Sequence, residues 1–198
     1  RNYMNKNELI GNLYDIGAIK VGDCTLASGL KSPIYIDLRT VISHPLLLKM
    51  VADEVWGALP SAQVELLCDV PYSGLPIAPK ISVTKDVPLI LVRKELKQHG
   101  TKKEVEGVFH ANQACVLIED LVTTGGSVLK VAEMLRKNGL QVNDVAVLVD
   151  RGQGAHETLK EQGVNLHAVI TAKEMFTVLK DENRLTKDEY DKIAEFLG

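Results

Sequence analysis

The chain has 198 residues, enough for a single domain that buries roughly two thirds of its unfolded surface. Its 45% hydrophobic and 25% charged residues and its net charge of −3 are typical of a soluble globular protein, with no indication of nucleic-acid or membrane binding. No apolar run approaches the roughly 18 residues of a membrane helix, and the polar N-terminus has no signal-peptide core, so we expect a cytoplasmic protein. Cys24, Cys68 and Cys115 lack metal-ligand spacing, and the apolar runs around Cys68 and Cys115 predict buried thiols in a reducing compartment.

The N-terminal part of the chain predicts one helix followed by short strands. Apolar residues at helical spacing within the segment 5–18 predict a helix that ends at Gly17. Residues 19–42 predict two or three short strands, with turns at Gly22 and at 28–33. We interpret this β-rich part as a small cap on the rest of the chain.

From Pro45 onward, strands and helices alternate. The predicted strands are 65–70, 88–93, 105–110, 114–118, 144–150 and 165–171, and the one at 105–110 is short. The predicted helices are 45–59, 75–85, 128–138, 155–162, 173–182 and a last one that begins at the capping box Thr186-x-x-Glu189. Apart from the short strand at 105–110, five strands joined by crossovers predict an α/β fold, with a central, mostly parallel sheet flanked by helices. We expect a single domain over 1–198, with the cap at about 1–42 and the core at about 43–198.

The most informative segment runs from Ala114 to Ser127, with the sequence ACVLIEDLVTTGGS. Its first five residues are apolar and predict a strand buried on both faces. Glu119 and Asp120 follow at the carboxyl end, the edge where open α/β sheets bind ligands. Thr123–Ser127 form a short loop that leads into a helix N-terminus, where N–H groups and the helix dipole favour an anion. Carboxylates for hydroxyl groups beside a phosphate-binding loop suit a ribose 5-phosphate.

The alternative for this segment is an ordinary strand, turn and helix cap, with Ser127 as the cap. It is disfavoured because adjacent carboxylates at a buried strand end repel each other and lose hydration unless they receive partners. Other phosphate-binding motifs are absent from the sequence, which contains neither G-x-x-x-x-G-K-[ST] nor G-x-G-x-x-G. The five histidines have no ligand spacing, so we expect no structural zinc site.

Two further features carry positive charge. The first is a basic stretch that interrupts the alternation of strands and helices and contains Arg93, Lys94, Lys97, His99, Lys102 and Lys103. A charged loop of about a dozen residues in a compact α/β domain is often a lid, and its cations suit a pyrophosphate; the alternative is a solvated surface loop. The second is Arg151, which follows a predicted strand and is placed either to bind a carboxylate in a bidentate manner or to form a surface ion pair with Asp150.

The segment VLIEDLVTTGGS resembles the phosphoribosyl-pyrophosphate (PRPP) motif of type I phosphoribosyltransferases. Four further segments resemble orotate phosphoribosyltransferases, and in particular the N-terminal domain of eukaryotic UMP synthases: SGLKSPIYID at 28–37, VPYSGLP at 70–76, RKELKQHG at 93–100 and LVDR at 148–151. The resemblance covers nearly the whole chain. It implies transfer of the 5-phosphoribosyl group from PRPP to orotate, giving orotidine 5′-monophosphate and pyrophosphate in UMP biosynthesis.

The resemblance also implies roles for individual residues. The 5-phosphate of PRPP is expected on Thr123, Thr124, Gly125, Gly126 and Ser127, and the ribose hydroxyls on Glu119 and Asp120. The pyrophosphate is expected near Tyr72, Ser73, Arg93, Lys94, Lys97 and His99, with Mg²⁺ bound through PRPP rather than by the protein alone. Orotate is expected on Tyr35, Ile36, Thr123 and Arg151. The catalytic candidates are Asp120, Lys97 and His99.

The resemblance further implies a homodimer in which the loop 94–104 reaches the partner's site, and a fused orotidylate decarboxylase domain in the natural gene, although the motif D-x-K-x-x-D of that domain does not occur here. The chain departs from the family at Ala27, where T-L-K-S-G usually carries lysine, and Ser73 stands where bacterial members have lysine. Two alternatives remain. One is a PRPP-binding regulator with weak or lost catalysis, which Ala27 favours, and the other is a phosphoribosyltransferase for a purine or for uracil.

Overall fold

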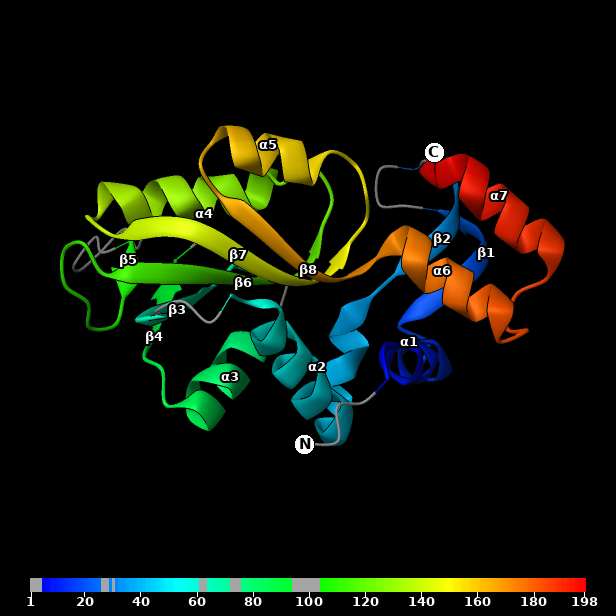
Figure 1. Cartoon of the computed structure of the whole chain (residues 1–198), viewed down its shortest axis with the longest axis horizontal. Coiled ribbons are helices and arrows are strands. Elements are labelled where there is room, and N and C mark those ends of the chain that lie inside the picture. Colours follow the sequence, from blue (N-terminus) through cyan, green and yellow to red (C-terminus); the bar gives the residue numbers. More distant parts are fainter. Residues whose placement is uncertain (1–4, 26–28, 30, 61–63, 72–75, 94–103) are drawn as a thin grey trace.

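The chain has an α/β fold in the computed structural model, which describes residues 5–25, 29, 31–60, 64–71, 76–93 and 104–198 (Figure 1). The strands are Ile19–Thr25 (β1), Lys31–Ile36 (β2), Leu66–Asp69 (β3), Leu89–Val92 (β4), Val105–Glu106 (β5), Ala114–Val122 (β6), Gln141–Asp150 (β7) and Asn165–Thr171 (β8). The α-helices are Lys6–Asp15 (α1), Pro45–Ala58 (α2), Ile77–Lys85 (α3), Gly126–Lys137 (α4), Ala155–Glu161 (α5), Ala172–Asp181 (α6) and Lys187–Leu197 (α7). A short 3₁₀ helix, η1, spans Leu38–Ser43.

The central sheet has the strand order β5-β4-β3-β6-β7-β8. All neighbouring pairs are parallel except β4 and β5, which are antiparallel. The prediction of a mostly parallel sheet of about five strands is confirmed, and β5 is a two-residue addition at the edge. This strand is shorter than the predicted 105–110 because Gly107, with φ of +118°, turns the chain away. The order of the strands reverses between β3 and β6, which makes the ends of these two strands the switch point of the sheet.

Strand β6 is longer than the sequence predicts. The apolar run suggests an end at Ile118, but the strand continues to Val122, because β7 pairs with it as far as Val122 and Asp150. On its other side, β6 is paired only as far as Ile118, where β3 ends at Asp69. Glu119 and Asp120 therefore extend past β3 while their backbone is still part of the ladder with β7.

Helices cover both faces of the sheet. Figure 1 shows α4 and α5 on one face and α2 and α3 on the other. Side chains of β6 alternate between the two cores: Cys115 and Leu117 pack with residues of α4 and α5, and Val116 and Ile118 pack with residues of α2 and α3. Helix α4 turns an apolar face to the sheet, and its buried residues are Val128, Val131, Ala132 and Leu135.

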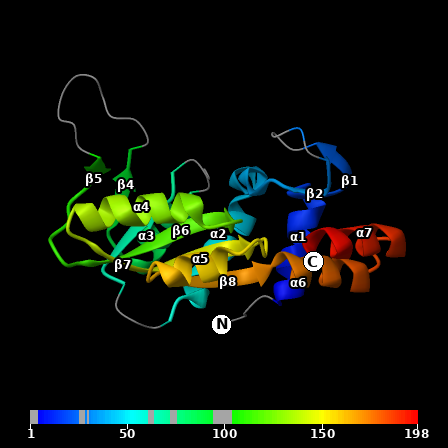
Figure 2. The same cartoon turned by 90° about the horizontal axis from the view of Figure 1, so that it is seen from above.

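The N-terminal strands form a separate antiparallel pair, β1 and β2. Figure 2 shows this pair at the opposite end of the molecule from β4 and β5. The residues that follow β2 form the 3₁₀ helix η1 and not a third strand. Helix α7 packs against β2 and α6, and α1 packs against α6. The β-rich N-terminal segment therefore shares its packing with the C-terminal helices, and the cap boundary near residue 42 stays a prediction.

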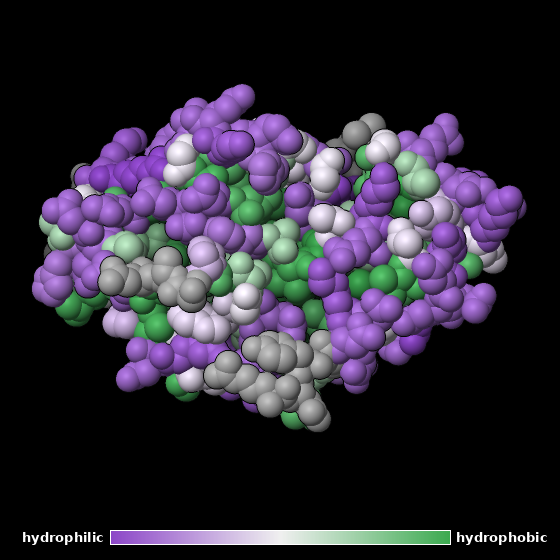
Figure 3. All heavy atoms as spheres, in the orientation of Figure 1, coloured by the Kyte–Doolittle hydropathy of each residue, from purple (hydrophilic) through white to green (hydrophobic). Residues whose placement is uncertain are grey.

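The surface in Figure 3 is hydrophilic over most of the visible face, with apolar residues showing mainly near its middle. Among the helices of the described residues, none combines the length and the apolar character needed to cross a bilayer. Cys68 and Cys115 are buried, as the apolar runs around them predict, and Cys24 is partly buried.

Candidate active site

The candidate site lies at the switch point of the sheet, where β3 and β6 end. In an open α/β sheet, the connections at such a point leave in opposite directions and open a crevice between them. Here β3 is followed by α3, which covers one face, and β6 is followed by α4, which covers the other (Figure 1). Side chains at the ends of these two strands therefore face a common space.

The loop between β6 and α4 forms a small pocket of about 60 Å³. It is lined by Glu119 and by residues 121–128. The turn depends on Gly125, which has φ of +85° and lies so close to α5 that a Cβ atom would be 3.0 Å from Leu159. Helix α4 begins at Gly126 without a side-chain cap, so the N–H groups of its first turn are left for a ligand. The loop thus has the geometry and the polarity of a phosphate site.

Three carboxyl groups lie around the ends of β3 and β6. Glu119 is only 4% exposed, and its Oε1 accepts a hydrogen bond from the Asp120 backbone N–H at 3.2 Å. The pKa of Asp120 is raised because the carboxyl group is buried, although its hydrogen bond with Glu119 opposes part of this rise. Burial, together with the nearby Asp120, raises the pKa of Asp69 to about 7. Burial thus disfavours the ionised forms of Asp69 and Asp120, and hydroxyl donors or a cation would favour them.

The residues after β2 approach the same carboxyl groups. Asp37 accepts hydrogen bonds from the Arg39 guanidinium at 2.7 and 2.8 Å, and these hold the pKa of Asp37 below its ordinary value. Asp37 is close enough to Asp120 for its charge to help raise the pKa of that group. The predicted orotate residues Tyr35 and Ile36 precede Asp37 at the end of β2 and are half-buried. The end of β2 is therefore placed beside the carboxyl groups of the site.

Arg151 follows β7, and its backbone N–H donates to the carbonyl oxygen of Val122, one of the residues that line the loop pocket. Its Nε is buried and has no hydrogen-bond partner within the described part of the chain. Burial lowers the pKa of the guanidinium. The Cζ atom lies 5.8 Å from the centre of the Phe196 ring. The alternative for Arg151, a surface ion pair with Asp150, is not formed; Asp150 instead accepts a hydrogen bond from the backbone N–H of Gly152.

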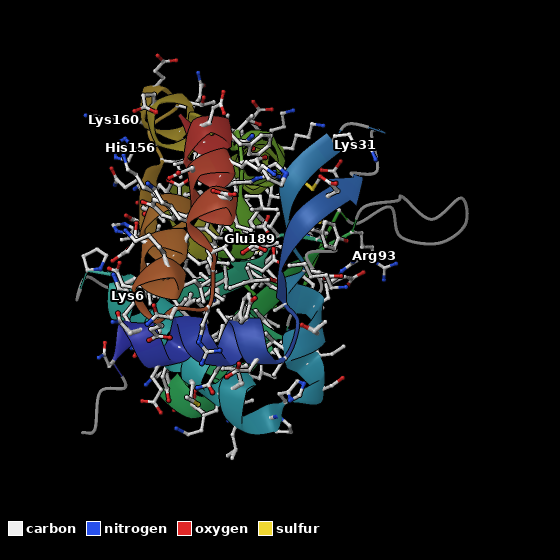
Figure 4. All side chains as sticks on the ribbon, turned by 90° about the vertical axis from the view of Figure 1, so that its right-hand side faces the viewer. Lys6, Lys31, Arg93, His156, Lys160 and Glu189 are labelled. Atoms are coloured by element: carbon white, nitrogen blue, oxygen red, sulfur yellow. The ribbon has the colours of Figure 1, made fainter. Side chains whose placement is uncertain are left out.

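Arg93, the first residue of the predicted basic loop, is held by an acidic neighbour. Its Nε donates to Glu106 of β5 at 2.7 Å. Figure 4 shows Arg93 and Lys31 extending from the same side of the molecule, opposite the side of Lys6, His156 and Lys160. A pyrophosphate contact by Arg93 would therefore compete with Glu106.

Most of the predicted site residues that the structure describes lie together. Glu119, Thr123, Thr124, Gly125, Gly126 and Ser127 line one pocket. Asp120 and Arg151 lie next to it. Five predicted site residues lie outside the described part of the chain: Tyr72, Ser73, Lys94, Lys97 and His99. Ala27 lies outside it as well.

Asp69 is a site residue that the sequence alone does not reveal. The sequence predicts a strand over 65–70, but it does not show that β3 lies beside β6, and this pairing alone brings Asp69 near Asp120. Among the residues that the structure describes, no three His, Cys, Asp or Glu side chains are arranged to hold a metal ion by themselves.

A mostly parallel sheet with an anion-binding loop and carboxyl groups at its switch point defines the class of α/β proteins that bind a phosphorylated ribose. The family model described as "Phosphoribosyl transferase domain" matches residues 61–172. The chain is 39% identical over 191 residues to a uridine 5′-monophosphate synthase of Bos taurus, which covers 96% of this chain and 40% of that protein. It is also 39% identical over 186 residues to an orotate phosphoribosyltransferase of Chlamydia caviae, covering 93% of this chain and 90% of that protein.

Among solved structures, the UMP synthase of Leishmania donovani superposes with a TM-score of 0.88 at 35% identity, covering all of this chain and 43% of that one. The chain therefore belongs to the phosphoribosyltransferase family, within the branch of the orotate phosphoribosyltransferases. It spans about two fifths of the length of the UMP synthases that it matches.

Proposed function

We propose that this chain transfers the 5-phosphoribosyl group from PRPP to orotate, which yields orotidine 5′-monophosphate and pyrophosphate, a step of UMP biosynthesis. The observation that carries the proposal is the position of Arg151. Its backbone N–H is hydrogen-bonded to Val122, which lines the phosphate pocket, and its buried Nε has no hydrogen-bond partner in the described residues. A cation that has no carboxylate partner among the described residues, beside a ribose-phosphate pocket, is suited to an acceptor base that carries a negative charge.

The phosphate pocket would hold the 5-phosphate through the loop 123–127 and the first turn of α4. Glu119 and Asp120 would accept hydrogen bonds from the ribose hydroxyls, which satisfies carboxyl groups that are otherwise poorly solvated. These contacts fix the ribose ring and leave its anomeric carbon facing the acceptor base. Such positioning converts a reaction between two free molecules into one between bound groups.

During transfer, the bond between the anomeric carbon and the pyrophosphate oxygen breaks, and a ring nitrogen of orotate forms the new bond and gives up its proton to the leaving pyrophosphate or to solvent. Positive charge grows on the ribose and negative charge on the pyrophosphate. Carboxylates at the ends of β3 and β6 would stabilise the former, and the cations Arg93, Lys94, Lys97 and His99 the latter. We propose Lys97 and His99 as catalytic residues on the basis of family resemblance, together with Asp120; Tyr72 and Ser73 would contact the pyrophosphate.

The donor set at the site fits Mg²⁺, because carboxylate oxygens are hard ligands of the kind that this ion prefers. Asp120 and Asp69 would face the ion, which would be held mainly by oxygens of PRPP. When bound, Mg²⁺ would neutralise charge on the leaving pyrophosphate. The raised pKa values of Asp69 and Asp120 support this arrangement, since a nearby cation relieves the cost of ionising both groups.

The proposed role of Arg151 is tested by Arg151→Ala in an assay of orotidine 5′-monophosphate formation. Loss of a buried charged partner typically costs 2–5 kcal/mol, so we expect kcat/KM for orotate to fall by at least about 30-fold. Arg184→Ala serves as the control, because Arg184 pairs with Asp15 and Glu182 outside the site. Unchanged kcat/KM for orotate in Arg151→Ala would contradict the role.

Two alternatives are separated by simple assays. A phosphoribosyltransferase for another base would turn over adenine or uracil faster than orotate in a substrate panel. A PRPP-binding regulator would bind PRPP but release no pyrophosphate with orotate, either as the wild type or as Ala27→Lys. The regulator rests on Ala27, which lies outside the described residues.

We also propose that the protein works in the cytoplasm as a homodimer, with the loop 94–104 reaching the partner's site. The thiols of Cys68 and Cys115 fit a reducing compartment, since burial raises the pKa of both, to about 12 for Cys115, and makes them unreactive. The length of the matching UMP synthases supports a fused domain, for which we propose an orotidylate decarboxylase. The sequence of the complete gene tests the fusion.

A further inference from the structure

The end of the C-terminal helix α7 meets the residue that follows β7. The Cζ atom of Arg151 lies 5.8 Å from the centre of the Phe196 ring, a distance at which a guanidinium is attracted to an aromatic ring. Figures 1 and 2 show the C-terminal end of α7 near the connection between β7 and α5. A residue near the end of the chain thus contacts the proposed orotate-binding cation.

The Arg151 side chain needs support from outside its own loop. The loop that follows contains Gly152 and Gly154, both with positive φ, and these residues impose little restraint on a neighbouring side chain. The backbone is fixed by the bond to Val122, but the guanidinium Nε has no hydrogen bond to any part of the chain that the structure describes. Without a neighbour, so long a side chain would sample many rotamers.

Helix α7 is firmly held and can provide this support. A capping box fixes its first turn, with Thr186 accepting from the Glu189 N–H at 3.2 Å and Glu189 accepting from the Thr186 N–H at 2.8 Å. Ile193 is 1% exposed and anchors the helix in the core. The helix lies between α6 and the β1–β2 pair (Figure 4) and packs on β2, the strand that carries Tyr35 and Ile36.

Phe196 itself is not a core residue. Its side chain is 39% exposed and borders a hollow of about 390 Å³ between α7 and the β1–β2 pair, which Lys31 and Pro33 also line. An aromatic ring at this position gains less from burial than the core residues of α7 do. The attraction between its ring face and the Arg151 cation is therefore the interaction that an aliphatic replacement would remove.

The chemistry of the contact suits a cation that must bind an anion. A carboxylate partner, such as Glu106 for Arg93, occupies N–H donors and competes with a ligand. An aromatic ring attracts the charge through its face and leaves the N–H groups at the edge of the guanidinium plane available.

We propose that Phe196 is a positioning residue, which holds the Arg151 guanidinium in the orientation that receives the carboxylate of orotate. The inference rests on the proposed function. It extends the base-recognition site to α7, which would act through Arg151. The base would then be recognised by the N-terminal strand β2 and the C-terminal helix α7, whereas the phosphate pocket is built from the middle of the chain.

The test compares wild type, Phe196→Leu and Phe196→Tyr in steady-state assays with orotate and PRPP varied separately. We expect Phe196→Leu to raise KM for orotate by about two- to fivefold, the range that a cation–π contact supports, and to leave kcat and KM for PRPP unchanged. Phe196→Tyr keeps the aromatic face and is expected to restore the KM for orotate. Val83→Ala is the control, since it removes an 82% exposed apolar side chain from α3.

A second measurement combines Phe196→Leu with Arg151→Ala. Because the ring acts through the guanidinium, its replacement is expected to have no further effect once Arg151 is absent. The inference is overturned if Phe196→Leu has the wild-type KM for orotate, if the KM values for both substrates rise together, or if its effect persists without Arg151. A wild-type chain that forms no orotidine 5′-monophosphate would instead contradict the proposed function, and this inference with it.

Discussion

Asp69 is a single carboxyl group whose ionisation is linked to the stability of the fold. Its pKa rises from an ordinary value of 3.8 to about 7, because it is buried and because Asp120 lies nearby. An acid with a raised pKa in the folded state binds its proton more tightly when folded. The stability that this proton contributes is present below about pH 4 and is lost as the pH rises through about 7.

We therefore predict that Asp69→Asn, which stays neutral, gains stability relative to the wild type as the pH rises from 4 to 8. A shift of this size corresponds to a gain on the order of 1–4 kcal/mol. Urea unfolding of the ligand-free proteins at each pH measures it. Glu133→Gln, which removes an exposed carboxylate from α4, is the control. Parallel stability curves for Asp69→Asn and wild type would show that Asp69 is not the responsible group.

At the residue scale, the sequence predicts side chains that follow each other along the chain and misses those that meet across strands. Glu119, Asp120 and the loop 123–127 are recognisable because they form one local pattern. Asp69 and Phe196 have no such pattern around them. Their environments arise from β3 pairing with β6 and from α7 packing beside the end of β7, and single-sequence periodicity carries no information on either contact.

At the scale of elements, the turn from β6 into α4 depends on Gly125, the first of two consecutive glycines. Alanine at Gly125 would adopt φ near +85° and place its Cβ 3.0 Å from Leu159. We predict that Gly125→Ala lowers the free energy of unfolding by roughly 1–3 kcal/mol, measured by chemical denaturation.

Gly126 provides the matched control for this prediction. It lies in the first turn of α4, and a Cβ atom there meets nothing nearer than Thr124 Oγ1 at 3.9 Å. Gly126→Ala is therefore expected to change stability by less than about 1 kcal/mol. Equal losses in the two variants would mean that the turn does not depend on the conformation of Gly125.

The elements also show which boundaries a sequence specifies. The helix that begins at Thr186 is predicted correctly because its capping box is local, and the structure shows both hydrogen bonds. A second capping box joins Thr171 and Glu174 at the start of α6, where the same pattern is present in the sequence. The end of β6 is predicted too early, because its length depends on pairing with β7 and not on its own apolar run.

At the scale of the whole molecule, the proposed homodimer predicts complementation between inactive variants. If the loop 94–104 completes the partner's site, Lys97→Ala and Arg151→Ala damage different halves of each site. Refolded together, they form mixed dimers in which one site has both residues intact. We expect recovery of about one quarter of the wild-type activity, because half of the dimers are mixed and half of their sites are complete.

Each variant refolded alone is the control for this experiment and should remain inactive. Absence of recovery, with mixed dimers shown to form, would indicate that each protomer supplies its own loop.

The fold class could be predicted from the alternation of strands and helices alone. The packing of α7 on β2 could not, since it joins the two ends of the chain.

The phosphate pocket is lined by one short stretch, Glu119 and residues 121–128, whereas the groups that we propose for recognition of the base come from β2, from the residue after β7 and from the end of α7. This division has a consequence for inheritance. A unit of ten consecutive residues is inherited as a whole even when the segments around it are duplicated or exchanged. The dispersed groups can each be replaced independently. Substitutions that change nucleobase specificity are therefore expected to accumulate outside that unit. Related proteins are expected to keep the phosphate-binding residues of their common ancestor.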